Sequence, residues 1–132
     1  MSEPSPHLLI VDDDERIRGL LRKFLIRHGF LVSVARDAAH ARRVLAGLDF
    51  DLIVMDVMMP GESGIETVKL FRFMEFGDDR YIPIIALTAH AGEDDRRRFL
   101  RAGMDGRITK PIKIGDFLQT IEKILGDRVR HS

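Results

Sequence analysis

Short apolar runs alternate along this chain with longer segments in which apolar residues recur every third or fourth position. Five runs are short enough to be strands: 8–11, 31–34, 52–55, 82–87 and a weaker one around 107–109. Five segments between and after them have helical spacing: 14–25, 38–48, 65–74, 93–102 and 114–125. Continuous apolar strands indicate burial on both faces, and regular alternation with helices indicates parallel neighbours joined by right-handed crossovers. The chain is therefore predicted to fold as a doubly wound α/β domain.

Capping residues mark the predicted helix boundaries. Asp14 and Glu15 stand where the first helix begins, and acids there favour capping of free N–H groups and complement the helix dipole. Glycine accepts the left-handed backbone that ends many helices. Three glycines are predicted to end the first, fourth and fifth helices: Gly29, Gly103 and Gly126.

The two ends of the chain differ in composition from the segment between them. Residues 1–6 hold two prolines and two serines, which is typical of a leader or linker, and residues 128–132 are expected to form a tail. One domain is therefore predicted over 7–127. Within it, the fourth helix is charged on most faces, with Phe99 and Leu100 as its only large apolar residues. That helix is predicted to pack thinly and to be the most mobile element.

Composition narrows the class of function. With 132 residues, of which 45% are hydrophobic and 32% charged, the chain has the size and make-up of one domain with its own core. Lys plus Arg and Asp plus Glu are equal at 21 each, so no overall positive field favours direct nucleic-acid binding. The absence of cysteine excludes disulfides, thiolate metal sites and a Cys nucleophile. No apolar run suits a membrane span or a signal peptide, so a soluble, cytoplasmic chain is expected.

Polar side chains stand at the ends of four predicted strands. Asp12 and Asp13 follow the first strand, Asp56 the third and Thr88 the fourth, and Lys110 lies just past the fifth. In an open parallel sheet, ligands bind outside the carboxyl ends of the strands, so these side chains are expected to converge at one edge. Three carboxylates that meet there repel one another unless a cation or raised pKa values compensate them.

Mg2+ fits this set of side chains. It takes oxygen ligands, keeps several waters and is commonly bound through a few carboxylates and phosphate oxygens, with Mn2+ as an alternative. A carboxylate can also attack phosphorus and form an acyl phosphate. Asp56 is the expected nucleophile because it directly follows an apolar strand and precedes a loop rich in Gly and Pro. Lys110 and Thr88 would then hold the phosphoryl oxygens.

Four sequence motifs together resemble the receiver domain of two-component response regulators, over essentially all of 8–126. They are LLIVDDDE at the first strand, LIVMDVMMPGESG around Asp56, ALTAH at the fourth strand and GRITKPI at the fifth. Each motif is weak alone, but their order and spacing are highly specific. The resemblance implies a flavodoxin-like (βα)5 fold with strand order 2-1-3-4-5. It also implies a phosphoacceptor switch that exchanges between inactive and active conformations.

The resemblance assigns the metal site and the acceptor to particular residues. Asp12 and Asp13 match the metal-binding pair, Asp56 matches the phosphorylated aspartate, and the backbone carbonyl of Met58 is implied as a further metal ligand. The implied donor is a phosphohistidine on a histidine kinase or a histidine phosphotransfer domain. Such a domain is not an enzyme acting on other molecules, although it assists its own phosphorylation and dephosphorylation.

The resemblance also covers the switch residues, with one departure. Thr88 matches the family's hydroxyl position, and Lys110 its phosphate-binding lysine, usually joined to the following proline by a cis peptide. Met58 and His90 fall where family members tune the attack of water on the acyl phosphate, although a solvent-facing loop residue is an equal alternative for His90. Arg107 stands where receivers often carry an aromatic ring that turns inward on activation. A downstream protein is expected to bind the face formed by the fourth helix, fifth strand and fifth helix.

Three rival functions remain to be weighed. A flavin carrier would need a Ser/Thr/Gly-rich phosphate loop where this chain has VDDDE, and a haloacid-dehalogenase-type phosphatase would need a second acid at Met58. A degenerate receiver, acting as a phosphorylation-independent binding module, is the remaining alternative, and Arg107 leaves it open. The segment AGMDGRITKPI resembles receivers attached to hybrid sensor kinases, so the chain could be part of such a protein.

Overall fold

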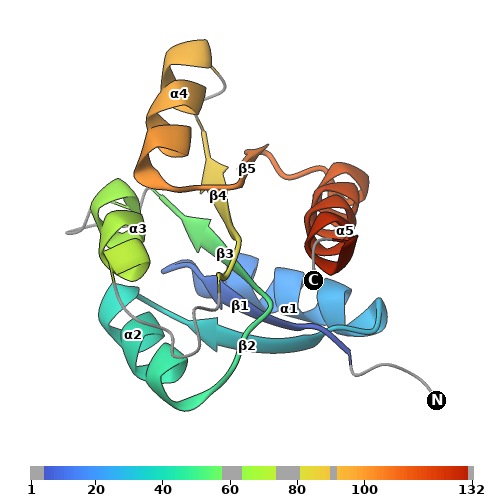
Figure 1. The fold of residues 1–132 in the computed structure, drawn as a ribbon. Helices are drawn as coiled ribbons and strands as arrows, with labels where there is room; N and C mark the ends of the chain where they lie inside the picture. Colours follow the sequence, from blue (N-terminus) through green and yellow to red (C-terminus); the bar gives the residue numbers. More distant parts are fainter. Residues whose placement is uncertain (1–4, 58–63, 74–80, 90–91, 131–132) are drawn as a thin grey trace.

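Five strands and five helices alternate along the chain in the computed structural model, which describes residues 5–57, 64–73, 81–89 and 92–130 (Figure 1). The strands are β1 (His7–Val11), β2 (Leu31–Ala35), β3 (Leu52–Asp56), β4 (Ile84–Thr88) and β5 (Gly106–Thr109). The helices are α1 (Glu15–Arg27), α2 (Ala38–Gly47), α3 (Gly64–Phe73), α4 (Glu93–Ala102) and α5 (Ile114–Arg130). The predicted alternation is confirmed.

The strands form one parallel sheet in the order β2-β1-β3-β4-β5, as predicted. Val11 pairs with Met55 across β1 and β3, and Asp56 pairs with Leu87 across β3 and β4. Because the chain moves outward from β1 in both directions, β1 and β3 are the neighbours at which the strand order reverses. The open crevice of this fold is therefore expected at their carboxyl ends.

Two apolar clusters cover the two faces of the sheet. Adjacent residues of a strand face opposite sides, so Val11 belongs to one cluster and Ile10 to the other. The cluster containing Val11 joins the sheet to α2, α3 and α4, and the cluster containing Ile10 joins it to α1 and α5. Figure 1 shows these two helix layers on opposite sides of the sheet. Strands buried on both faces explain why their sequences are continuous apolar runs.

The helix ends agree with the sequence at three of four predicted positions. Asp14 caps α1, and its side chain accepts hydrogen bonds from the backbone N–H groups of Arg16 and Ile17. Gly29 and Gly103 follow α1 and α4 with positive φ angles of 89° and 104°. The predicted stop at Gly126 is wrong, because α5 continues to Arg130. A glycine inside a helix costs only about 1 kcal/mol, and no proline follows it to force an end.

α4 packs on the sheet through few side chains, as predicted. Among its described side chains only Phe99 and Ala102 are buried, while Leu100 is 49% exposed. Its C-terminal end is tied down by Arg72 of α3, which donates to the Gly103 carbonyl at 2.9 Å and forms an ion pair with Asp105 at 2.8 Å. The carboxylate of Asp105 also accepts from the Tyr81 hydroxyl at 2.7 Å. The C-terminal end of α4 is therefore fixed by polar contacts with Arg72, in addition to the burial of Phe99 and Ala102.

Candidate phosphoacceptor site

The polar residues at the strand ends meet at one edge of the sheet. Asp12 directly follows β1, and its backbone N–H donates to the Ala35 carbonyl at the end of β2. Asp56 is the last residue of β3, and Thr88 is the last residue of β4. Lys110 follows β5, and its backbone N–H donates to the Thr88 carbonyl at 2.7 Å. Regular strand pairing therefore brings together residues that are far apart in the sequence.

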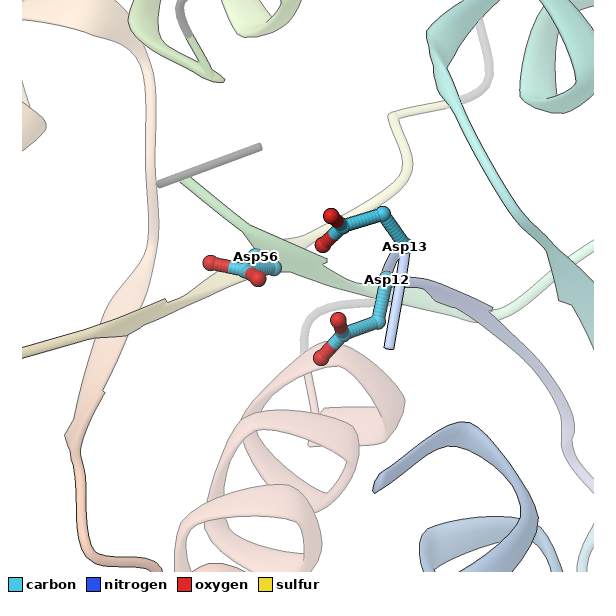
Figure 2. Close-up of side chains that lie close together, drawn as sticks. All are labelled: Asp12, Asp13 and Asp56. Carbon is cyan, nitrogen blue, oxygen red and sulfur yellow. The ribbon is translucent and has the colours of Figure 1, made fainter. Parts of the chain in front are cut away.

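Three carboxylates gather beside the ends of β1 and β3 (Figure 2). One oxygen from each of Asp12, Asp13 and Asp56 lies within 4.8 Å of the others. Asp12 and Asp56 are buried, and Asp13 is exposed. Three negative charges at this separation repel one another strongly, and a hard divalent cation with oxygen ligands relieves that repulsion. The group can hold such an ion, with Asp13 on the side open to solvent.

Asp12 carries the clearest electrostatic signal at this site. Its Oδ1 accepts from the backbone N–H of Asp14 at 2.9 Å, whereas its buried Oδ2 has no hydrogen-bond partner among the described residues. Burial raises the pKa of Asp12 from 3.8 to about 6; the Asp14 hydrogen bond opposes this shift and the charge of Asp56 adds to it. A buried oxygen without a donor is costly in a folded protein. Its position among carboxylates fits a metal ligand.

Lys110 supplies a positive charge on the other side of Asp56. Its Nζ lies 3.3 Å from Asp56 Oδ2, and the side chains are 27% and 4% exposed respectively. The Lys110–Pro111 peptide is cis, as the family resemblance implies. Thr88 is fully buried at the adjacent strand end. The Asp56 carboxylate thus has two acids on one side and the Lys110 ammonium group on the other, and Thr88 ends the neighbouring strand.

One residue at this edge was missed by the sequence analysis. Arg18, on the second turn of α1, donates from Nη1 to the backbone carbonyl of Asp12 at 2.8 Å. This bond spans six residues and fixes the turn in which the first two acids stand. The sequence gives only one local indication of this bond, which is that Arg18 stands about one turn after the capped start of the helix. Many exposed arginines stand at such positions, so the indication is weak.

The remaining predicted site residues fall in two groups. Met58 and His90 lie outside the described residues. Arg107 is on β5, paired with Ala86, and its side chain points to the α4 side of the sheet, where Nη1 donates to the Gly92 carbonyl at 3.0 Å. The structure therefore links Arg107 to the start of α4 and not directly to Asp56.

The part of the chain that the structure describes contains no helix long and apolar enough to cross a membrane.

Comparisons with known proteins identify the family of this chain. A family model described as the response regulator receiver domain matches residues 8–122. Protein PetR of Rhodobacter capsulatus is 54% identical over 125 residues, which cover 95% of this chain and 51% of that protein. The chain thus spans about half the length of this curated relative.

Two solved structures have a similar fold. The receiver domain of the sensor histidine kinase PA1611 from Pseudomonas aeruginosa, solved with a magnesium ion in its active-site cleft, is 30% identical with a TM-score of 0.80, covering 92% of this chain and 98% of that one. The receiver domain of Ssk1 from Saccharomyces cerevisiae, solved with the histidine phosphotransfer protein Ypd1, is 29% identical with a TM-score of 0.80, covering 92% and 90%. Since the family model spans most of the chain and the strand order agrees with it, the chain belongs to the response regulator receiver domains of two-component signalling.

Proposed function

We propose that Asp56 accepts a phosphoryl group from a phosphohistidine, in a reaction that requires Mg2+ bound by Asp12, Asp13 and Asp56. The observation that carries this proposal is the grouping of three carboxylate oxygens within 4.8 Å of one another, with the Lys110 ammonium 3.3 Å from the acceptor. The negative charges of these three carboxylates repel one another, and nearby cations such as Mg2+ and the Lys110 ammonium group reduce that repulsion. The Met58 carbonyl is a further proposed ligand, by resemblance alone.

The transfer itself needs little beyond positioning and charge neutralisation. An oxygen of Asp56 attacks the phosphorus, a new O–P bond forms, and the P–N bond to the donor imidazole breaks with its electron pair leaving on nitrogen. Mg2+ would neutralise oxygens of the transferred group. Lys110 is proposed to pair with another phosphoryl oxygen, which the 3.3 Å distance between its Nζ and Asp56 Oδ2 supports. Thr88 is the proposed hydroxyl donor from β4.

The donor is proposed to be a histidine kinase or a histidine phosphotransfer domain. This is supported by the family and by the similar Ssk1 receiver, which was solved with the histidine phosphotransfer protein Ypd1. The same family supports a role as a signalling domain that assists its own phosphorylation and dephosphorylation, without turnover of an external substrate.

Intact mass after incubation with a small phosphodonor tests the acceptor. With Mg2+ we expect one phosphoryl adduct, which is absent in Asp56→Asn and in the presence of a metal chelator. Hydroxylamine cleaves acyl phosphates and leaves phosphate esters intact, so it should remove the adduct. An adduct that survives hydroxylamine, or that persists in Asp56→Asn, would contradict the proposal. No adduct under any condition would favour the phosphorylation-independent binding module.

The proposed conformational response begins at the N-terminal end of α4. There the cap residue Gly92 offers no side-chain cap, and its carbonyl is held by Arg107 at 3.0 Å. At the other end, α4 is anchored by Arg72 and Asp105. A new dianion at Asp56 attracts nearby donors, and we expect the N-terminal end of α4, which Arg107 holds by one exposed hydrogen bond, to move more readily than the C-terminal end. Hydrogen exchange with and without phosphorylation should change in the first turn of α4 and remain unchanged around Gly103; the opposite pattern would refute this.

The proposed partner face for the downstream protein is formed by α4, β5 and α5. It contains a cavity of about 250 Å3 between α4 and β5 that Leu100 and Arg107 help to line. Leu100 is 49% exposed and Ile114 is 36% exposed, so this face offers apolar surface beside charged residues. Leu100→Asp should weaken binding of the downstream protein without lowering Asp56 phosphorylation, which separates the partner face from the acceptor.

A further inference from the structure

A charged groove lies between α3 and α4, and its lining residues differ from those of the acceptor site and from those of the cavity at the proposed partner face. Its volume is about 490 Å3. Six charged residues line it: Glu66 and Lys69 from α3, and Asp94, Arg97, Arg98 and Arg101 from α4. The residues from α4 occur at i, i+3, i+4 and i+7, which places them on one stripe of the helix. These charged side chains of α4 lie opposite Glu66 and Lys69 of α3, across the groove.

The groove has opposite charge at its two ends. α3 and α4 both cross back from one parallel strand to the next, so they run in the same direction, and their first turns lie near the carboxyl edge of the sheet. Glu66 is in the first turn of α3, and Asp94 is the second residue of α4. The basic residues follow them on both helices. The acidic end of the groove therefore lies toward the phosphoacceptor edge, and the basic end lies away from it.

The arginines of the basic end are not neutralised within the part of the chain that the structure describes. Lys69 forms an exposed ion pair with Glu66 at 3.9 Å. Arg97, Arg98 and Arg101 have no hydrogen bond or ion pair with a described residue, unlike Arg96 next to them, which lies 3.8 Å from Glu93. Complementing the helix dipole accounts for Arg101 in the last turn, but not for all three.

We infer that the basic end of this groove is a docking site for a short acidic segment of a partner protein. Arg97 and Arg101 lie about 6 Å apart along the helix axis, from the helical rise per residue. Carboxylates at alternate positions of an extended segment, or four apart on a helix, repeat at about the same distance. The chain as a whole has equal numbers of acidic and basic residues, which suits a short acidic segment better than a long polyanion such as nucleic acid. This inference does not depend on phosphorylation of Asp56.

The binding test uses the whole unphosphorylated chain and a short glutamate-rich peptide carrying a fluorescent label. Fluorescence anisotropy at low ionic strength should give saturable binding that weakens as salt is added, because exposed charges are screened. A lysine-rich peptide of the same length should not bind. A single-stranded oligonucleotide is the competing occupant, and tighter groove-dependent binding of it would overturn the assignment to an acidic protein segment.

Two triple variants separate the groove from the general charge of the protein. Each exposed ion pair contributes about two- to threefold in affinity, so Arg97→Gln/Arg98→Gln/Arg101→Gln should lower affinity about tenfold. The matched control is Arg22→Gln/Lys23→Gln/Arg27→Gln, which removes the same charge from exposed positions of α1 and should change affinity less than about twofold. Equal losses in the two variants, or no binding by the wild-type chain, would refute the inference.

A third variant is expected to raise the affinity for the acidic peptide, so a loss of folding cannot imitate its effect. Glu66→Gln/Asp94→Asn removes the two acids of the groove and should raise affinity for the acidic peptide about threefold or more. Replacement of the three arginines by lysine should keep most of the affinity, since the charge is retained. Circular dichroism melts of each variant show whether it is folded. An affinity unchanged by removing the two acids would contradict the groove as the binding site even if the arginine variant were unstable.

Discussion

Replacing Asp12 by asparagine should stabilise the metal-free protein at neutral pH. The Asp12 carboxylate is fully buried, one of its oxygens has no partner among the described residues, and its pKa is raised to about 6. At pH 7.5 the folded protein must ionise this group against its burial and against the charge of Asp56. A pKa raised by about two units corresponds to a cost of about 3 kcal/mol. Asparagine keeps the acceptor for the Asp14 N–H and replaces the unpartnered oxygen with an uncharged N–H donor in the same carboxylate cluster as Asp56.

The sign of the pH dependence follows from the direction of the shift. Because the pKa of Asp12 is about 6 when folded and 3.8 otherwise, the folded protein holds a proton that the unfolded chain releases between these values. This contribution to the free energy of unfolding is complete below about pH 4 and is lost as pH rises through about 6. The advantage of Asp12→Asn over wild type is therefore expected to be near zero at pH 4 and about 1–3 kcal/mol at pH 7.5.

Urea denaturation followed by circular dichroism, in the presence of a chelator, measures this difference. In a thermal melt it corresponds to about 4–12 °C for a domain of this size. Asp13→Asn is the matched control: it removes the same charge from an exposed position, where solvent screens the repulsion, so it should stabilise the metal-free protein by less than about 1 kcal/mol. Saturating Mg2+ should stabilise the wild type and not Asp12→Asn. The reasoning fails if Asp12→Asn is no more stable than the wild type at pH 7.5 without metal, or if its advantage persists unchanged at pH 4.

Three further substitutions test the structural contacts around the site and α4, each by chemical denaturation. Asp14→Ala removes the cap of α1 and should cost about 1 kcal/mol, whereas Asp14→Ser, which can still cap, should cost little. Asp105→Ala leaves the half-buried Arg72 without its ion pair and should lower the free energy of unfolding by about 2–4 kcal/mol. The same change removes the hydrogen bond from the Tyr81 hydroxyl, so it should lower the pKa of Tyr81 from about 12. The fall should be partial, because burial is the larger cause of the raised pKa and remains. Tyr81 is the one tyrosine in the sequence, so ultraviolet titration reports it alone, and an unchanged pKa would contradict the contact. Gly103→Ala should cost about 1–2 kcal/mol, since Gly103 has a φ of 104° and an added Cβ would lie 2.9 Å from Arg72 Cγ; a neutral result would be inconsistent with that backbone.

The features that sequence predicts well here are local or follow from sheet geometry. The apolar run before Asp56 predicts a buried strand, and parallel strands bring their carboxyl ends to one edge whatever their separation in the chain. The Asp14 cap involves residues two and three positions away, so it too can be read from neighbouring residues. For these reasons the residue pattern alone is enough to predict a doubly wound domain and the convergence of the strand-end residues, whereas the strand order was implied by the family resemblance.

The features that sequence reasoning missed depend on side chains that reach across the fold. Arg72 and Asp105 are 33 positions apart, and nothing in either neighbourhood indicates that they pair. The Arg107 contact with Gly92 depends on where α4 begins relative to β5. Gly126 failed as a helix stop because glycine only weakens a helix and ends it mainly where a positive φ is required, as at Gly29. The side-chain contacts are therefore decided by packing across the fold and the helix end by backbone conformation, and residue type alone predicts neither.

The thin attachment of α4 to the sheet has a consequence for how this domain can diversify. Among the described side chains of α4, only Phe99 and Ala102 are buried, so most positions on the helix can change without creating a cavity. Exposed residues of α4 can therefore be substituted, by evolution or by protein engineering, while the carboxylates at the ends of β1 and β3 keep their positions. In this architecture the outer surface of α4 can change to suit a new binding partner while the carboxylate cluster at the ends of β1 and β3 is retained.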